Sequence, residues 1–274
     1  MIKIIVDSGC SIKQEEAKKY DVEILPLKLL IGEKEYLDDV DLSIDQFYEE
    51  FLKTKKMPKT SLPSLETAQN LVEKHTKSGN DVIFLTISSG ISGSYNAMRL
   101  IFQDNPHVRV IDSKLAVGAI RLLVEEANKY RDKSLDFVEQ KINDLIPKIK
   151  ILAIPEKLDY LLKGGRLSAI GWIIGTMLQL KPIISFKNGK VVAEAKKIGL
   201  KSSMQYIIQE LDKLGVDENY PIIASYTYKD DNLQKLIAMT DAKFTKQISV
   251  FDNLDPAIAC HWGPNAFGYI FVVK

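Results

Sequence analysis

The feature that most constrains this fold is an alternation of two kinds of segment in the first half of the chain. Short runs rich in β-branched residues recur as IKIIV, VEILPL, DVIFLTI and VRVID, and the segments between them carry apolar residues at helical spacing. This alternation favours a mainly parallel sheet with helices on both faces. Because ligands of such sheets bind beyond the carboxyl ends of the strands, we expect a binding site in the loops that follow these runs.

The pattern changes near residue 150. After IKILAIP come a predicted helix, an apolar stretch and a hairpin, PIISFKNGKVVAEA, that turns at Asn188-Gly189. The remaining helical segments and the strands PIIASY and AFGYIFVV are typical of a mixed sheet with helices. We therefore predict an α/β fold with two domains: an N-terminal three-layer α/β/α domain over residues 1–150, whose sheet is mainly parallel, and a C-terminal α+β domain with a mixed sheet over residues 151–274.

Charge and cysteine content exclude several classes of function. The 37 Lys and Arg against 36 Asp and Glu leave a net charge of +1, which gives no field that argues for nucleic acid. Cys10 and Cys260 are too few and too distant for a disulfide framework or a CxxC site, and the histidines form no metal set, so we predict no metal and no cofactor. The chain has no signal-peptide core and no apolar run of about 20 residues, which predicts a cytoplasmic protein.

The clearest candidate binding element follows the run VIFLTI. The segment Ser88–Ser94 contains four serines and two glycines and leads into the helical pattern NAMRLIFQ. A strand, a Ser/Gly turn and a helix start together predict an anion site, because free amides and the helix dipole favour negative charge and Ser92 adds a hydroxyl. The alternative is that Ser92 is simply a helix cap. The spacing matches neither a GxSxG, a GxGxxG nor a Walker A pattern, which argues against nucleotide binding.

Two capping patterns flank a second segment with hydroxyl groups. Ser43 with Gln46 forms a capping-box pattern ahead of FYEEFL, and Ser64 can cap LETAQNLVEKH. Between them, the prolines of KTKKMPKTSLPS keep Thr60 and Ser61 out of a helix and predict an extended surface loop. The hydroxyls of this loop are available to a ligand.

Two further polar positions stay open between functional and structural roles. Asp7 and Ser8 end the first strand, where they can orient a neighbouring loop, touch a ligand or cap the helix predicted to begin at Lys13. His261 precedes a Gly-Pro turn and can hydrogen-bond an anion, although a single histidine is more often structural.

Taken together, IVDS, KTSLPS, LTISSGISGSY, VIDS, LLKGGR, LKPIISFKNGK and HWGP resemble, in this order and over essentially the whole chain, the DegV family of bacterial fatty-acid-binding carriers. The resemblance implies an N-terminal domain that contributes the carboxylate-binding loops and a C-terminal domain that encloses the acyl chain. It also implies a carrier without catalysis of its own, which presents a bound long-chain fatty acid to an ATP-dependent fatty acid kinase that forms the acyl phosphate, in phospholipid metabolism. Transient contact with a membrane is compatible with this role.

The resemblance also implies roles for individual residues. Those expected to bind the fatty-acid carboxylate are Thr60, Ser61, Ser92, Gly93 and His261. Those in a supporting or partner-docking role are Asp7, Ser8 and Arg166, with a structural helix-end role equally open for Arg166. The acyl-tunnel candidates in the apolar stretch, which can equally be a packed core helix, are Ile170, Ile174, Met177 and Leu178.

This sequence departs from the family pattern at two places, and two other functions remain open. The family's DSxxDL reads DSGCSI here and lacks the second acid, and lysines in AKKIGLKSS stand where many members carry an arginine. A serine-dependent acyl hydrolase would use Ser92 as nucleophile and His261 as base, although no acid partner is evident. A scaffold protein would bind no lipid.

Overall fold

The computed structural model describes residues 1–54, 56–167 and 180–274, and these form two compact units. The N-terminal unit comprises Met1–Pro147 and a short later segment, Asp255–Ile258. The C-terminal unit comprises Lys148–Leu254 and Ala259–Lys274. No helix among the described residues has the length and apolar character needed to cross a membrane.

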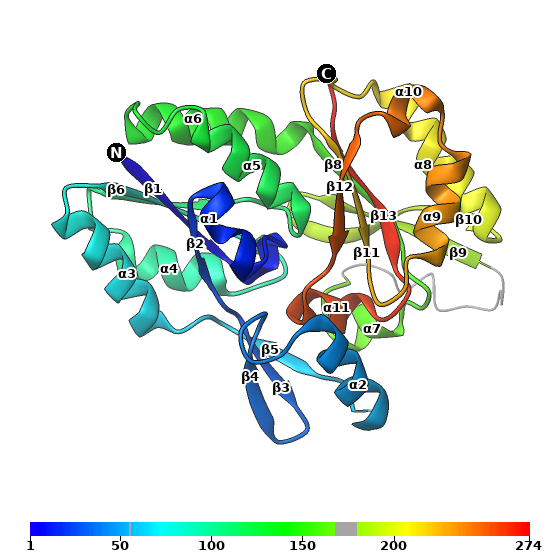
Figure 1. Cartoon of the computed structure of the whole chain (residues 1–274), viewed down its shortest axis with the longest axis horizontal. Coiled ribbons are helices and arrows are strands. Elements are labelled where there is room, and N and C mark those ends of the chain that lie inside the picture. Colours follow the sequence, from blue (N-terminus) through cyan, green and yellow to red (C-terminus); the bar gives the residue numbers. More distant parts are fainter. Residues whose placement is uncertain (55, 168–179) are drawn as a thin grey trace. The chain divides into compact units, whose positions relative to one another are not determined.

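The sheet of the N-terminal unit is parallel throughout, in the order β2-β1-β6-β7. Its strands are β1 (Ile2–Asp7), β2 (Val22–Leu25), β6 (Asp81–Thr86) and β7 (Val108–Asp112). Helices α3 (Leu65–Lys77) and α4 (Ser94–Phe102) cover one face, and α5 (Gly118–Asn128) and α6 (Leu135–Leu145) cover the other (Figure 1). The short helices are η1 (Ser8–Cys10), η2 (Gln14–Glu16), α1 (Ala17–Tyr20) and η3 (Ile146–Lys148). The predicted three-layer arrangement is confirmed.

The strands are apolar on both faces because helices cover both. On one face, Ile5 and Phe84 pack against Val72 of α3 and Met98 of α4, and all four side chains are buried. This double burial explains why the strand runs are nearly continuous in apolar residues rather than alternating.

A small antiparallel sheet, which the sequence did not predict, follows β2. Its order is β4-β3-β5, with β3 (Lys28–Ile31), β4 (Lys34–Leu37) and β5 (Lys59–Ser61), and α2 (Ile44–Thr54) lies between the last two strands in the chain. The prediction of a surface loop at Thr60 and Ser61 was therefore wrong in part: the segment is extended but pairs with β3. Prolines on either side exclude a helix yet are tolerated next to a short edge strand.

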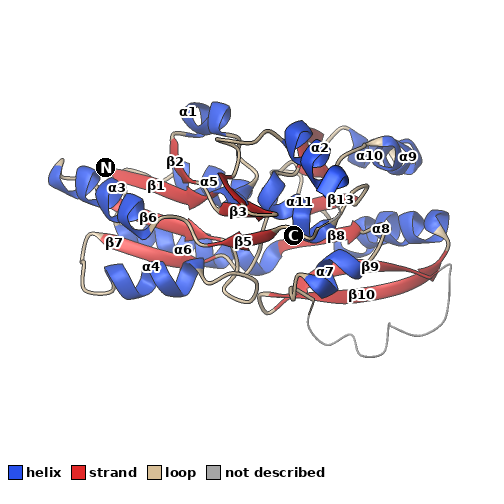
Figure 2. Cartoon of the chain, turned by 90° about the horizontal axis from the view of Figure 1, so that it is seen from below, coloured by secondary structure: helices blue, strands red, loops and turns tan. Residues whose placement is uncertain are grey.

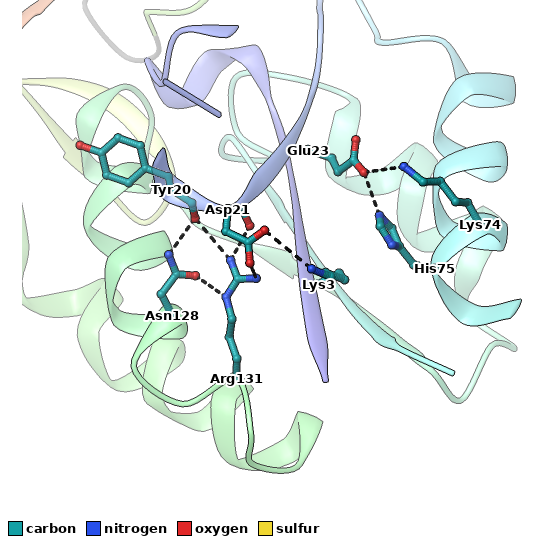
Figure 3. Close-up of polar contacts among 8 residues, drawn as sticks. All are labelled: Lys3, Tyr20, Asp21, Glu23, Lys74, His75, Asn128 and Arg131. Carbon is teal, nitrogen blue, oxygen red and sulfur yellow. Dashed lines mark hydrogen bonds and ion pairs between the residues drawn. The ribbon is translucent and has the colours of Figure 1, made fainter. Parts of the chain in front are cut away.

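Polar contacts fasten the edge strand β2 to its neighbours (Figure 3). Glu23 on β2 accepts from Lys74 and contacts His75 of α3, each at 3.0 Å. At the start of the strand, Arg131 bonds the side chain and carbonyl of Asp21. These contacts account for His75 as a structural residue.

The C-terminal unit contains a six-stranded mixed sheet in the order β10-β9-β8-β13-β11-β12. Figure 2 labels β8, β9, β10 and β13 of this sheet. Its strands are β8 (Ile149–Ile154), β9 (Leu180–Lys187), β10 (Lys190–Ile198), β11 (Ile222–Tyr226), β12 (Ile248–Asn253) and β13 (Phe267–Val272). Only the β11–β12 pair is parallel among these strands. The helices are α7 (Asp159–Lys163), α8 (Leu200–Leu214), α9 (Asp231–Met239), α10 (Ala242–Thr245) and α11 (Pro256–Trp262). The predicted mixed sheet is confirmed.

The segment Asp255–Ile258 belongs to the N-terminal unit although it lies near the end of the sequence. The amide of Ala257 donates to the buried carboxylate of Asp38 over 2.9 Å, and Asp255 forms an ion pair with Lys13. Helix α11 therefore begins in one unit and ends in the other.

Candidate functional site

The Ser88–Ser94 turn follows β6 and leads into α4. Its backbone folds back on itself, since the amide of Ser92 donates to the carbonyl of Ser88 over 3.0 Å. The hydroxyl of Ser92 accepts from the amide of Ser94 at 3.2 Å and lies 3.0 Å from the Ser94 hydroxyl. The alternative that Ser92 is the N-cap was therefore wrong: Ser92 lies one residue before the N-cap, although its hydroxyl accepts from the first amide of the helix. When Ser94 donates within the hydroxyl pair, the proton of Ser92 is free to be donated to an anion.

Gly93 occupies the N-cap of α4, a nine-residue helix. Across the described part of the chain, the amide of Gly93 finds no protein acceptor. A Cβ at this position would lie 3.2 Å from Cδ2 of Leu62, so glycine allows Leu62 to close against the turn. The amide of Gly93, the hydroxyl of Ser92 and the positive end of the helix dipole together suit one carboxylate.

Thr60 lies on β5, two residues before Leu62, which lies against this turn. It lies opposite Leu29 in the β5–β3 pair, and directly opposed residues share a face of the sheet. Leu29 is fully buried, so Thr60, which is half-buried, lies on the covered face, and Ser61 is exposed on the other. Leu62, which packs against Gly93, follows two residues later. The structure therefore brings the end of β5 against the turn.

Asp7 and Ser8 orient loops of the protein. Both are buried, and Asp7 accepts from the amide of Ile87 at 3.0 Å. Burial raises the pKa of Asp7 to about 7, against the opposing effect of its hydrogen bond from Ile87. Ser8 donates to Asp38 over 2.6 Å and accepts from the amide of Leu27 over 3.0 Å. The helix that follows Lys13 has Lys13 itself as its N-cap, so neither Asp7 nor Ser8 caps it, and of the predicted alternatives the geometry favours orientation of a neighbouring loop.

In the C-terminal unit, α7 ends in the Gly-Gly-Arg motif as a Schellman motif. The amide of Arg166 donates to the carbonyl of Leu161 and the amide of Gly165 to that of Leu162, both over 3.0 Å. Gly165 has a φ of +69°, the left-handed conformation this motif requires. The Arg166 guanidinium also donates to the carbonyl of Gly164 over 2.6 Å. Arg166 therefore contributes to the end of α7, which is one of the two alternatives predicted for it.

His261 packs directly on this helix end. A Cβ at Gly164 would lie 2.5 Å from Nδ1 of His261, and a Cβ at Gly263 would lie 2.2 Å from the ring of Tyr160. The segments that contain LLKGGR and HWGP thus interlock: the ring of His261 lies against the backbone of Gly164, and the ring of Tyr160 lies against the backbone of Gly263. The sequence analysis predicts no role for Gly164 or Tyr160 in positioning His261. The glycine in each motif could have indicated that a side chain lies close to the backbone there.

The environment of His261 sets its protonation. Burial, together with the smaller effect of the positive charge of Arg166, lowers the pKa of His261 to about 4. The imidazole is therefore neutral at neutral pH, able to donate one hydrogen bond but weakly basic. A general base for the Ser92 hydrolase alternative works best with a pKa near the operating pH, so this value disfavours that alternative. His261 lies in the last turn of α11, ahead of the predicted Gly-Pro turn.

The predicted acyl-tunnel residues lie outside the described residues: Ile170, Ile174, Met177 and Leu178. A hollow of about 370 Å³ occurs between the end of α4, the loop that follows it and the start of β7. Its lining includes none of the predicted carboxylate-binding residues.

The remaining histidines and cysteines have structural surroundings. His107 contacts Asp81 at 2.8 Å, and His75 contacts Glu23. Cys10 and Cys260 are both buried, and neither forms a disulfide bond among the described residues. Within the described ranges, no group of three His, Cys, Asp or Glu side chains is placed to hold a metal ion.

Comparison with known proteins decides the family. The family model described as "Uncharacterised protein, DegV family" matches residues 1–274. The chain belongs to the DegV family. The resemblance predicted from its motifs is confirmed, and it extends over the full length.

Solved structures of other DegV proteins share this fold. A Streptococcus agalactiae protein described as a fatty-acid-binding DegV family protein is 26% identical with a TM-score of 0.91, over 100% of this chain and 99% of that one. A stearic-acid-binding protein from Eubacterium ventriosum is 28% identical with a TM-score of 0.84, over 100% and 99%. The Streptococcus pneumoniae fatty acid kinase B3 protein loaded with linoleic acid is 24% identical with a TM-score of 0.83, over 100% of both chains, a similarity of fold alone.

Proposed function

We propose that this protein binds a long-chain fatty acid and presents its carboxylate to a partner fatty acid kinase for phosphorylation to acyl phosphate. One observation carries the proposal: the hydroxyl of Ser92 and the unpartnered amide of Gly93, among the described residues, stand at a helix N-terminus against the strand that bears Thr60. Binding of fatty acid by the relatives from S. agalactiae and E. ventriosum supports it.

The energetics suit a carrier that holds its ligand mainly by the tail. Each buried methylene contributes roughly 0.8 kcal/mol, so a 16-carbon chain gains on the order of 10 kcal/mol gross. A hydrogen bond to a charged group contributes about 1.5–3 kcal/mol. The tail therefore sets the affinity, and the head-group contacts set the orientation.

In this proposal the two parts of the chain have different tasks. Residues 1–150 supply the carboxylate-binding loops, and residues 151–274 enclose the acyl chain, with the tunnel candidates in the apolar stretch. His261 and Arg166 supply a neutral donor and a positive charge to the carboxylate or the docked kinase. The kinase as partner rests on similarity of fold to the S. pneumoniae protein. The carrier acts in the cytoplasm, with no cofactor and no catalysis of its own.

The test replaces the two hydroxyls and measures binding. Delipidated protein carrying Thr60→Ala and Ser92→Ala is titrated calorimetrically with palmitate, and the exposed Thr67→Ala on α3 is the matched control. We expect roughly 10- to 100-fold weaker binding for each lost charge-assisted bond and unchanged melting without ligand. Identical affinity in the double variant and wild type refutes the head-group site. Hydrolysis of acyl esters that depends on Ser92 would instead support the hydrolase.

A further inference from the structure

Three consecutive amides at the start of the Ser88–Ser94 turn donate to the strands that flank β6: two to the last residues of β1 and β7, and one to the loop after β7. The amide of Ile87 donates to the side chain of Asp7 at 3.0 Å, and that of Ser88 donates to the carbonyl of Leu115 at 2.8 Å. The amide of Ser89 donates to the side chain of Asp112 at 3.0 Å. Three consecutive residues are thus fixed to the neighbours of β6, and the two side chains that do so are acidic.

Of the two acidic side chains, Asp112 makes more hydrogen bonds to this segment than Asp7 does. It pairs with Thr86 in the β6–β7 register, at the carboxyl end of both strands. One carboxylate oxygen accepts from the amides of Ser89 and Lys114 at 3.0 Å each, and the other accepts from the hydroxyl of Ser89 at 2.6 Å. The last distance is typical of a charge-assisted O–H···O⁻ bond. Asp112 therefore binds both the backbone and the side chain of one residue of the turn.

Asp7 holds the opposite side of the same turn. It follows Val6, which pairs with Leu85, so Asp7 and Asp112 flank the end of β6 in one row. Gly9 allows close approach here, because a Cβ at that position would lie 2.4 Å from Cγ2 of Ile87. Both DS dipeptides of the sequence, IVDS and VIDS, supply one of these acids.

The rest of the turn depends on these anchors. The amide of Gly90 donates to the Ser88 hydroxyl at 3.1 Å, and the amides of Ile91 and Ser92 donate to the Ser88 carbonyl at 3.1 and 3.0 Å. These bonds are internal to the turn, so they fix Ser92 relative to Ser88 and not relative to the sheet. The sheet therefore positions Ser92 from two sides: through residues 87–89, and through α4, whose Met98 packs on the sheet.

We infer that Asp112 is a positioning residue for the carboxylate site, acting with Asp7 to fix the Ser88–Ser94 turn without touching the ligand. The inference rests on the proposed function. It predicts that loss of Asp112 weakens recognition of the acid head group specifically, while an acyl chain with another head group is bound as before.

The experiment compares two probes, palmitic acid and 1-hexadecanol, in delipidated full-length protein. In Asp112→Ala we expect palmitate affinity to fall about 3- to 10-fold, the equivalent of one lost hydrogen bond, with unchanged affinity for the alcohol. Asp112→Asn restores binding, because the amide can accept from the Ser89 backbone and donate to the Ser89 hydroxyl. The matched control is Asp81→Ala, at the opposite end of β6, which leaves both affinities unchanged.

The outcomes separate this inference from the proposed function. Wild-type protein that fails to bind palmitate refutes the proposed function. Wild-type binding with an Asp112→Ala variant that matches it, or that loses both probes equally, overturns the inference alone. Hydrogen exchange without ligand provides a second measurement: amides of Ser89 and Ser92 exchange faster in Asp112→Ala if the carboxylate fixes the turn, and at the wild-type rate if it does not.

Discussion

Substitution Gly164→Ala tests whether the helix end of α7 positions His261. The φ of Gly164 is −72°, which alanine adopts without strain, so the effect is steric. The new Cβ would lie 2.5 Å from Nδ1 of His261 and 2.9 Å from the carbonyl oxygen of Tyr160. Overpacking of this kind costs about 1–3 kcal/mol, and the lower entropy of the unfolded alanine chain offsets about 0.4–1 kcal/mol. We expect a net loss of about 1–2 kcal/mol.

Two assays check this prediction. Thermal unfolding of the C-terminal unit should begin about 3–8 °C lower than in wild type. An NMR titration should show the imidazole of His261, displaced from its buried position, with a pKa above the wild-type value of about 4 and closer to the ordinary 6.5. The control, Lys163→Ala, changes an exposed neighbour and should alter neither. Wild-type melting together with a wild-type imidazole titration in Gly164→Ala would refute the interlock.

Two further predictions concern buried polar groups. Burial raises the folded-state pKa of Asp7 to about 7, above its unfolded value near 3.9, so the stability of the wild type falls as the pH rises between these values. Asp7→Asn should lack that fall, and its stability relative to wild type, measured by urea unfolding, should therefore grow by about 2 kcal/mol from pH 5 to pH 8. A difference that does not depend on pH would contradict the assignment. The fully buried Thr227 donates to the carbonyl of Gly263 at 2.6 Å and accepts from the amide of Ala266 at 2.9 Å. Thr227→Val should therefore lower the free energy of unfolding by about 2–4 kcal/mol. A loss no larger than that of the control Thr245→Val would show that these bonds contribute little.

Local patterns in the sequence were sufficient for much of the fold. The capping box at Ser43 and Gln46 forms in both directions, at 3.0 and 3.3 Å, and the hydroxyl of Ser64 caps α3 at 3.2 Å. The hairpin turns at Asn188 and Gly189, both with positive φ, as a two-residue turn between twisted strands requires. Each of these features depends on residues close together in the sequence.

Features that depend on distant residues were not predicted. β5 forms because Thr60 can pair with Leu29, and nothing within KTSLPS itself indicates that partner. The role of Asp112 depends on β7 lying beside β6, and the contact of His261 with Gly164 joins segments about 100 residues apart. Sequence motifs therefore located the Ser88–Ser94 turn, the proposed carboxylate site, but not the groups that hold it in place.

Assignment of Asp255–Ile258 to the N-terminal unit has a consequence for biosynthesis. The ribosome makes that segment near the end of translation, so the contacts of Asp38 with Ala257 and of Lys13 with Asp255 form only after most of the C-terminal unit has been synthesised. The first-made half of the molecule is thus completed by one of the last-made pieces, and the two halves must mature together.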